Sequence, residues 1–356
     1  MQKKKIAFVM PGTGRKPIGG FKIVFEYSRR FSELGYNVTI LCPAWISTNR
    51  NLQVSKLKRL VRFPLLKVYY KLFKVRWANL GNAKYKFYWA HTKSKLEKYD
   101  VIIATSIETA YLVNQLKPCV KQLYFIQGFE NWSYSDQEVL ASYKFNMKKI
   151  VISPWLKDYV SAVSEDSVVI PNGLDSFRFR LVRTIEKRNK FEISMLYHSS
   201  EIKGCSDSFE ALRIVKNKIP ELHVTMFGVY QKPQDLPEWF TYYQNPSKEI
   251  HNTLYNDSAI FISASISEGF GLTVGEAMLC GCAVACTDTG GFRMMVEDGK
   301  TGLISPVKNP EKLAENILKL IENDELRINL AKSGNNYVQQ FNWDESVKKF
   351  IEVIES

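Results

Sequence analysis

Residues 259–288 read AIFISASISEGFGLTVGEAMLCGCAVACTD, and this stretch decides the fold. An apolar run ends near Ser265, a loop carries Glu268, a helical pattern begins near Thr273, and a second apolar run begins at Cys282. Two short apolar runs joined by a helical pattern are typical of neighbouring parallel strands in a sheet with helices on both faces. The stretch therefore predicts an α/β protein.

The same alternation extends along the chain in both directions and is interrupted once, by a charged stretch near 177–192. We expect strands at 5–10, 37–42, 100–105, 122–127, 149–153, 167–171, 192–198, 222–228, 259–265, 282–288 and 302–306. The pattern predicts two doubly wound, Rossmann-like domains that face one another across a cleft. Their expected ranges are 1–171 and 191–335, with a linker at 172–190 and a C-terminal helix at 336–356 that packs back on the first domain.

Ligands of open α/β sheets bind at the carboxyl ends of the strands, so the polar residues there are the candidates. Glu268 and Glu276 stand eight positions apart, and Gly269 and Gly271 between them let backbone amides approach a ligand closely. The helix that begins here offers free N–H groups to a phosphate. Glu268 could bind sugar hydroxyls and Glu276 a ribose diol; alternatively, Glu268 caps a turn and Glu276 complements the helix dipole.

A second polar turn follows the strand expected at 192–198. Lys203 and Gly204 stand at the entry to the next helix, where a lysine can pair with a diphosphate as a point charge. His198, at the end of the strand, could donate to the same group. An exposed turn lysine and a histidine at the edge of the core are the alternatives.

The turn after the first strand reads PGTGRKPIGGF (11–21) and is rich in glycine, including Gly19 and Gly20. The dinucleotide pattern Gly-x-Gly-x-x-Gly fails because Pro17 occupies the third glycine position, so we expect no NAD site. No Asp-x-Asp occurs and the histidines are scattered, so we expect no metal. The cysteines at 280, 282 and 286 match no common zinc spacing and are expected to be small, buried and reduced.

The segment SISEGFGLTVGEAMLCGCAVACTDTGG (265–291) resembles the Glu-x7-Glu segment of retaining nucleotide-sugar glycosyltransferases with the GT-B fold, of family 4, the glycogen-synthase-like group. IPNGLD (170–175), the Lys-Gly pair that opens a helix, and GGFRMMVEDGKTGLISPVKNPEKLAENI (290–317) are similar to that family in the same order. The resemblance covers most of the chain and is most specific from about residue 168 to 310.

The resemblance implies a role for each matching residue. Glu268 would contact the donor sugar, Glu276 the nucleotide ribose, and Lys203 the diphosphate leaving group. The family needs neither metal nor another cofactor. Further donor contacts would come from the backbone of Gly269, Phe270, Gly271 and Leu272, from Gly19 and Gly20 of the first domain, and from a nucleobase-binding stretch at 243–246 that contains Asn245.

Two departures from the family pattern concern the reacting groups. The family commonly has an arginine where this chain has His198, so that residue is either protonated on binding or replaced by another cation. Many members also carry a histidine near the reacting sugar in the first domain. Here the corresponding strand end, YFIQGFENW, offers Gln127 and Glu130 on the acceptor side instead.

The formal net charge of +13 is carried by one segment, because residues 50–98 contain fourteen Lys or Arg and a single acid, Glu97. Its apolar residues follow helical spacing, with Pro64 dividing the pattern. We expect this insertion to lie on an anionic membrane surface without spanning it. A solvated basic surface is the alternative; with the sugar-nucleotide architecture, we expect no nucleic-acid partner.

The function implied is transfer of a sugar from a nucleotide-diphosphate sugar to a glycan acceptor, lipid-linked or of the cell envelope. The acceptor hydroxyl would attack on the face that the nucleotide leaves, so the configuration is retained without a protein nucleophile. The start of the chain does not have the pattern of a signal peptide, so we expect a cytoplasmic protein that is peripheral on the inner membrane face. The alternatives are a catalytically silent partner subunit of the same fold and a nucleotide-sugar epimerase.

Overall fold

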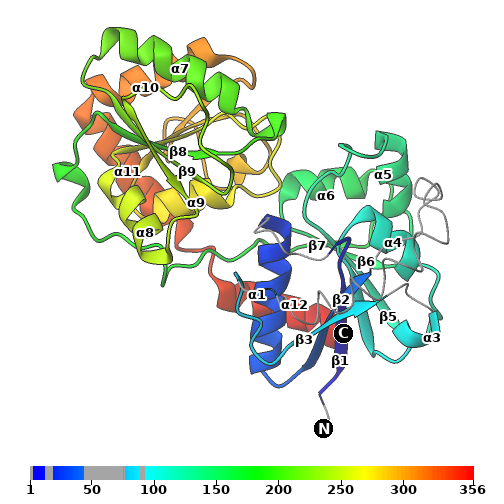
Figure 1. Cartoon of the computed structure of the whole chain (residues 1–356). Coiled ribbons are helices and arrows are strands. Elements are labelled where there is room, and N and C mark those ends of the chain that lie inside the picture. Colours follow the sequence, from blue (N-terminus) through cyan, green and yellow to red (C-terminus); the bar gives the residue numbers. More distant parts are fainter. Residues whose placement is uncertain (1–2, 13–18, 44–74, 76, 89–92) are drawn as a thin grey trace. The chain divides into compact units, whose positions relative to one another are not determined.

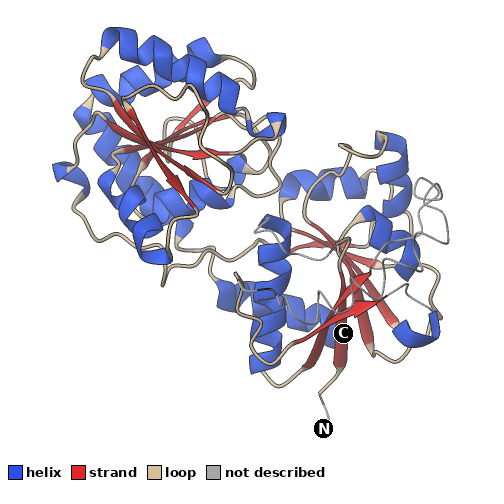
Figure 2. Ribbon diagram, in the orientation of Figure 1, coloured by secondary structure: helices blue, strands red, loops and turns tan. Residues whose placement is uncertain are grey.

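The computed structural model describes the chain except for residues 1–2, 13–18, 44–74, 76 and 89–92. It divides the chain into two compact units, residues 171–346 and residues 1–170 together with 347–356. Each unit is a parallel sheet with helices on both faces (Figures 1 and 2). The expected α/β architecture of two doubly wound sheets is confirmed.

Seven strands of the described residues form the first sheet, in the order β3-β2-β1-β4-β5-β6-β7. All neighbours in it run parallel. The strands are β1 (Lys5–Val9), β2 (Asn37–Pro43), β3 (Lys84–Tyr88), β4 (Val101–Ala104), β5 (Lys121–Ile126), β6 (Lys148–Val151) and β7 (Ser167–Val169). The helices are α1 (Gly19–Glu33), α3 (Lys93–Leu96), α4 (Ile107–Val113), α5 (Asp136–Tyr143), α6 (Pro154–Ser161) and α12 (Trp343–Glu355).

Helix α12 returns to the first unit, to which residues 347–356 belong. The ring of Phe350 is fully buried and lies 4.8 Å from Tyr27 and 5.4 Å from both Phe31 and Phe125, between ring centroids. The expected helix at 336–356 is shorter, because residues up to Val338 belong to the preceding helix. The last helix of the chain thus completes the core of the first unit.

The second sheet has the strand order β10-β9-β8-β11-β12-β13, and all its neighbours run parallel. Helices α7 and α10 cover one face, and α8, α9 and α11 the other (Figure 1). The strands are β8 (Glu192–Tyr197), β9 (His223–Gly228), β10 (Phe240–Gln244), β11 (Ile260–Ser263), β12 (Ala283–Thr287) and β13 (Leu303–Ser305). The helices are α7 (Cys205–Lys218), α8 (Lys248–Asp257), α9 (Leu272–Leu279), α10 (Pro310–Glu322) and α11 (Asp324–Val338).

The strand order reverses between β8 and β11, which are neighbours in the sheet although 62 residues lie between the end of β8 and the start of β11. From β8 the chain proceeds outward to β9 and β10, and from β11 it proceeds the other way to β12 and β13. The loops after β8 and β11 therefore lie at the point where the strand order reverses, which is where open α/β sheets usually have the crevice that binds the ligand. These are the loops that carry Lys203 and Glu268.

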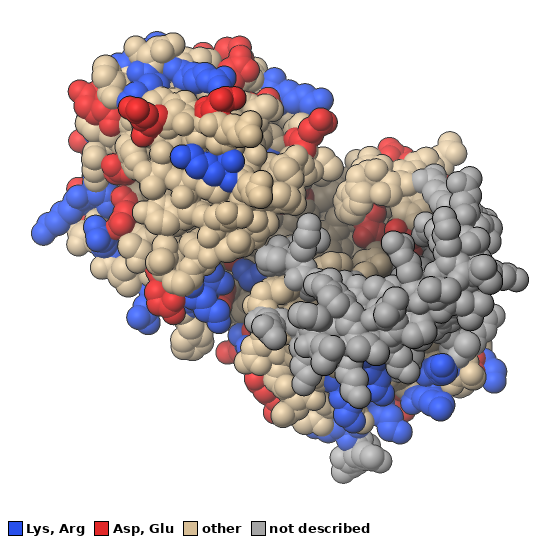
Figure 3. All heavy atoms as spheres, viewed as in Figure 1, with Lys and Arg blue, Asp and Glu red and all other residues tan. Residues whose placement is uncertain are grey.

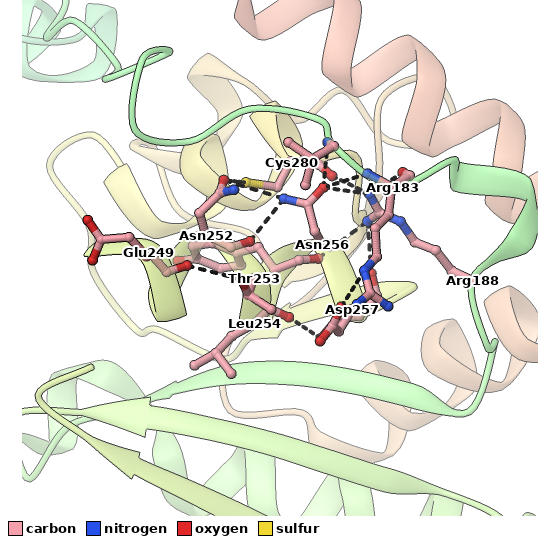
Figure 4. A network of polar contacts seen from close by, with 12 residues as sticks. Arg183, Arg188, Glu249, Asn252, Thr253, Leu254, Asn256, Asp257 and Cys280 are labelled. Atoms are coloured by element: carbon pink, nitrogen blue, oxygen red, sulfur yellow. Dashed lines mark hydrogen bonds and ion pairs between the residues drawn. The ribbon is translucent and has the colours of Figure 1, made fainter. Parts of the chain in front are cut away.

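The stretch expected as a linker, 172–190, is held on the second unit. Asn256 of α8 is fully buried, and its side-chain oxygen accepts the backbone N–H of Val182 at 2.8 Å and of Arg183 at 3.2 Å (Figure 4). Arg188, 8% exposed, donates to the carbonyl oxygens of Ser258 and Cys280. Backbone groups that would be solvated in a free linker are thus satisfied by α8, and the Arg188 side chain binds the carbonyl groups that follow α8 and α9.

Two strands were missing from the sequence-based expectation, β3 and β10. Both lie at the edge of their sheets as the structure describes them, and both alternate aromatic with polar residues, KYKFY and FTYYQ. Most of the basic insertion expected at 50–98 lies outside the described residues, namely 50–74, 76 and 89–92. Of its remainder, β3 pairs with β2 as part of the sheet.

Acidic and basic side chains are interspersed on the face of the second unit that Figure 3 shows. Among the helices in the described part of the chain, none combines the length and the apolar character needed to cross a membrane. The described cysteines form no disulfide, and those at 280, 282 and 286 are buried, as expected.

Candidate active site

The loops after β8 and β11 are joined to each other at the crevice. The backbone N–H of Ile266 donates to the carbonyl oxygen of Ile202 at 2.8 Å. Gly204 has a φ of 58°, and a Cβ there would lie 1.9 Å from the carbonyl oxygen of Ala264. Only glycine fits this approach, because any side chain would collide with the backbone of the next loop. The Lys-Gly pair thus fixes the lysine beside the Glu268 loop.

Lys203 and Glu268 form an ion pair across these loops, with 2.6 Å between Nζ and Oε1. Their side chains are 29% and 13% exposed, respectively. The hydroxyl of Ser265 donates to the same carboxylate oxygen at 2.9 Å. The two residues expected to act on the diphosphate and on the sugar therefore contact each other directly.

His198 lies beside this pair as a neutral imidazole. The backbone N–H of Ser200 donates to Nδ1 at 2.9 Å, so that nitrogen carries no proton and Nε2 holds it, facing the Tyr230 hydroxyl at 3.3 Å. Burial, and after it the nearby ammonium of Lys203, lower the pKa of His198. In this structure His198 is thus a neutral imidazole, and its protonation on binding, or substitution by another cation, stays a prediction.

Helix α9 begins next to Glu268 without a side-chain cap. The residue before the helix, Gly271, has a φ of 90°. The N–H groups of the first turn, including that of Leu272, have no acceptor within the helix. A Cβ at Gly291 would lie 2.5 Å from the carbonyl oxygen of Glu268, so the loop after β12 packs closely against the Glu268 loop. Phe270 anchors that loop: it is 3% exposed and its ring packs on Phe341.

A helix that begins near Thr273 would have Glu276 in its first turn, but α9 begins at Leu272, and Glu276, its fifth residue, lies in the second turn. Its side chain is 4% exposed and lies near the buried Tyr255. Burial first, and the Glu276 carboxylate second, raise the pKa of Tyr255 well above its usual value. Glu276 is therefore held inside the unit, whereas Lys203 and Glu268 line the open edge.

Asn245 is exposed at the carboxyl end of β10, in the left-handed conformation with a φ of 48°. Its backbone N–H donates to the carbonyl oxygen of Gly228, at the end of β9, at 2.8 Å. The stretch expected to meet a nucleobase thus lies at the same edge of the sheet as the Lys203 loop.

In the first unit, Gly19 and Gly20 open helix α1 after β1, and Gln127 follows β5. A Cβ at Gly20 would lie 3.5 Å from Nε2 of Gln127, which shows that the two are neighbours at the carboxyl edge of the first sheet. The structure brings these two predicted residues together even though more than 100 positions separate them.

Glu130 is the most perturbed carboxyl group of this edge. Its Oε2 accepts the backbone N–H of Ile107, the first residue of α4. Burial raises the pKa of Glu130 to about 8, the Ile107 hydrogen bond opposes that rise, and Glu108 adds to it. The carboxyl group is therefore largely protonated at neutral pH and can donate a hydrogen bond.

Two residues that contact the predicted site residues, Ser265 and Tyr230, were not predicted from the sequence. Ser265 stands three residues before Glu268, in the quoted motif, but its apolar neighbours gave it the pattern of a strand residue. Tyr230 follows β9, and only the sheet order shows that it faces His198. Within the described ranges, no three His, Cys, Asp or Glu side chains cluster as a metal site would need.

The two units, each a doubly wound parallel sheet, are those of the GT-B fold. The sucrose-phosphate synthase of Thermosynechococcus elongatus matches 99% of this chain and 98% of its own, with a TM-score of 0.71 at 17% identity. HepE of Anabaena, solved in complex with UDP and glucose, matches 99% of both chains with a TM-score of 0.75 at 15% identity. At these identities the likeness shows the fold alone.

Residues 181–337, within the second unit, match the family described as Glycosyl transferases group 1. A trehalose synthase of Thermococcus litoralis is 23% identical over 65% of this chain and 59% of its own. A phosphatidyl-myo-inositol mannosyltransferase of Mycobacterium tuberculosis is 24% identical over 55% of this chain and 56% of its own. An uncharacterized glycosyltransferase of Methanocaldococcus jannaschii is 38% identical over 27% of this chain and 28% of its own. The chain thus spans less than two thirds of each of these relatives.

Proposed function

We propose that the chain is a retaining glycosyltransferase of family 4 that transfers a sugar from a nucleotide-diphosphate sugar to a glycan acceptor. One observation carries the proposal: Lys203 and Glu268 meet at 2.6 Å where the strand order of the second sheet reverses, next to the uncapped start of α9. An ammonium, a carboxylate and free backbone N–H groups in one crevice suit an anionic leaving group attached to a sugar.

In the proposed reaction the protein acts by electrostatics. Lys203 and the N-terminus of α9 stabilise the departing diphosphate, and Glu268 stabilises the positive charge that develops on the sugar ring. The acceptor hydroxyl attacks from the face that the diphosphate leaves, and the leaving group takes its proton. The bond between the anomeric carbon and the phosphate oxygen breaks while the new glycosidic bond forms, so no protein nucleophile and no metal is needed.

The donor is proposed from the fold neighbours and the predicted contacts. HepE of Anabaena was solved with UDP and with UDP-glucose, so UDP-glucose is the first donor to test. Glu276 would bind the ribose, and the edge at Asn245 would meet the base. Gly19, Gly20, Gln127 and Glu130 would serve the diphosphate and the acceptor from the first unit.

For the acceptor we propose a lipid-linked or cell-envelope glycan, reached from the cytoplasmic face of the membrane. The support is the net charge of residues 50–98, fourteen basic residues against one acid, which suits an anionic lipid surface. The related phosphatidyl-myo-inositol mannosyltransferase has a lipid in its name.

The function is tested by incubating the purified chain with nucleotide sugars and a membrane glycolipid extract and following the anomeric protons of the product by NMR. We expect a product with the anomeric configuration of the donor. Inversion would contradict the retaining mechanism. The neutral His198 favours a second candidate, a silent partner subunit; nucleotide binding without turnover of any donor would support it.

The membrane proposal has a test of its own. Sedimentation with vesicles of 30% phosphatidylglycerol in phosphatidylcholine should pull down the intact chain at low salt and release it at high salt. Charge reversal at Lys67, Lys71 and Lys74 should abolish the binding, whereas reversal of the same number of lysines in the second unit, at Lys300, Lys312 and Lys319, should leave it unchanged. Equal binding by both triple variants would contradict the proposal.

A further inference from the structure

The Lys203–Glu268 ion pair has a consequence for which ligand the site admits. The ammonium that would bind the diphosphate and the carboxylate that would bind the sugar already neutralise each other at 2.6 Å. Both side chains are largely shielded from water, so the pair is worth more than an exposed one. Any ligand that needs Lys203 must compete with Glu268 for it.

We infer that this ion pair is a latch that favours the complete nucleotide sugar over the nucleoside diphosphate it becomes. The inference rests on the proposed function and concerns which ligand the same site prefers. A nucleotide sugar replaces both partners of the latch: its diphosphate binds Lys203, and its sugar hydroxyls donate to Glu268. A nucleoside diphosphate replaces one partner and leaves the carboxylate beside a new anion without a donor from the ligand.

That difference is unfavourable for the product for two physical reasons. A carboxylate that is only 13% exposed loses its cation and regains little hydration. In addition, the carboxylate and the diphosphate are like charges at short range, in a place where water screens them weakly. Product release is thereby eased, and inhibition by the product is reduced.

The neighbouring charges do not substitute for Lys203. His198 is neutral, as its hydrogen bond from Ser200 shows. Arg293, after β12, is engaged by Asp288, with 2.5 Å between Nε and Oδ1. Glu201 is exposed on the turn that leads to Lys203 and adds a negative charge without contacting the latch pair.

Ser265 acts as a positioning residue in this scheme. It is 1% exposed and donates to the oxygen of Glu268 that Lys203 also contacts. When Lys203 turns to the diphosphate, the Ser265 hydroxyl keeps the carboxylate aimed at the sugar. Its removal should therefore affect the sugar and spare the diphosphate.

Titration calorimetry on the full chain tests the latch with UDP, GDP, ADP and dTDP and with the glucose conjugate of the diphosphate that binds best. In Glu268→Gln we expect that diphosphate to bind about ten times more tightly than in the wild type, while the conjugate gains nothing, so the preference is lost. The matched control is Glu201→Gln, which removes the same charge nearby and leaves the latch intact; its affinities should stay within about twofold. Melting curves verify that each variant is folded.

Equal diphosphate affinity in the wild type and Glu268→Gln, or an equal gain in Glu201→Gln, would overturn the latch and leave the proposed function standing. Failure of all four diphosphates to bind either protein would overturn the proposed function and the latch together. Ser265→Ala gives an independent check. We expect a raised KM for the nucleotide sugar and an unchanged affinity for the diphosphate. A variant that binds the nucleotide sugar and the diphosphate more weakly by the same factor would contradict the positioning role.

Discussion

Glu130 shows how the fold changes the chemistry of a single residue. Its carboxyl group lies against the start of α4, with Glu108 and the buried phenols of Tyr124 and Tyr143 near it. Burial raises its pKa to about 8, whereas an unfolded glutamate titrates near 4.5. Between these values the folded chain holds a proton that the unfolded chain releases, so the contribution of Glu130 to stability falls as the pH rises.

The replacement Glu130→Gln keeps an acceptor for the Ile107 N–H and removes the titration. We expect the variant and the wild type to melt alike at pH 5, and the variant to melt roughly 5 to 15 °C higher at pH 8.5. Glu165→Gln, an exposed site in the same unit, is the control and should follow the wild type at both values. A constant difference between Glu130→Gln and the wild type across this pH range would contradict the raised pKa.

At the scale of elements, α12 supplies part of the core of the first unit, and a substitution in it measures that contribution to stability. Phe350 is fully buried among the rings of Phe8, Tyr27, Phe31 and Phe125. Because no neighbour can fill the space of a lost ring, Phe350→Ala should lower the free energy of unfolding of this unit by about 3–5 kcal/mol. Phe177→Ala, at a ring of the second unit that is 88% exposed, should change the free energy of unfolding of either unit by less than about 0.5 kcal/mol. Chemical denaturation measures both, and a tolerant Phe350→Ala would mean that α12 is not part of the core.

The elements also show what the sequence could predict. Central strands such as β1, β4 and β11 are continuous apolar runs that bury both faces, so their positions followed from hydrophobicity. The edge strands β3 and β10 bury only part of one face, and their mixed patterns concealed them. Lys203 and Glu268 could be singled out from their places after strands. Their contact, and the roles of Ser265 and Tyr230, depend on which strands are neighbours, which local patterns do not specify.

At the scale of the whole molecule, the two units have sheets of the same design, and each has predicted site residues at the carboxyl edge of its sheet. The second unit contains the residues that match the glycosyl transferases group 1 family and the Lys203–Glu268 pair. The first unit has Gly20, Gln127 and Glu130 at the corresponding edge of its own sheet. The net positive charge lies in residues 50–98, so the proposed membrane contact and the proposed chemistry belong to different parts of the sequence.

The most direct test of the central claim is the steady-state rate of glycosyl transfer by Lys203→Ala and Glu268→Ala. Lys300→Ala and Glu297→Ala, which break an exposed lysine–glutamate ion pair of the same unit, are the matched controls. We expect each site variant to lose at least about 100-fold in kcat/KM while it melts as a folded protein, and each control to retain the wild-type rate. Near-normal transfer by both site variants would contradict the account.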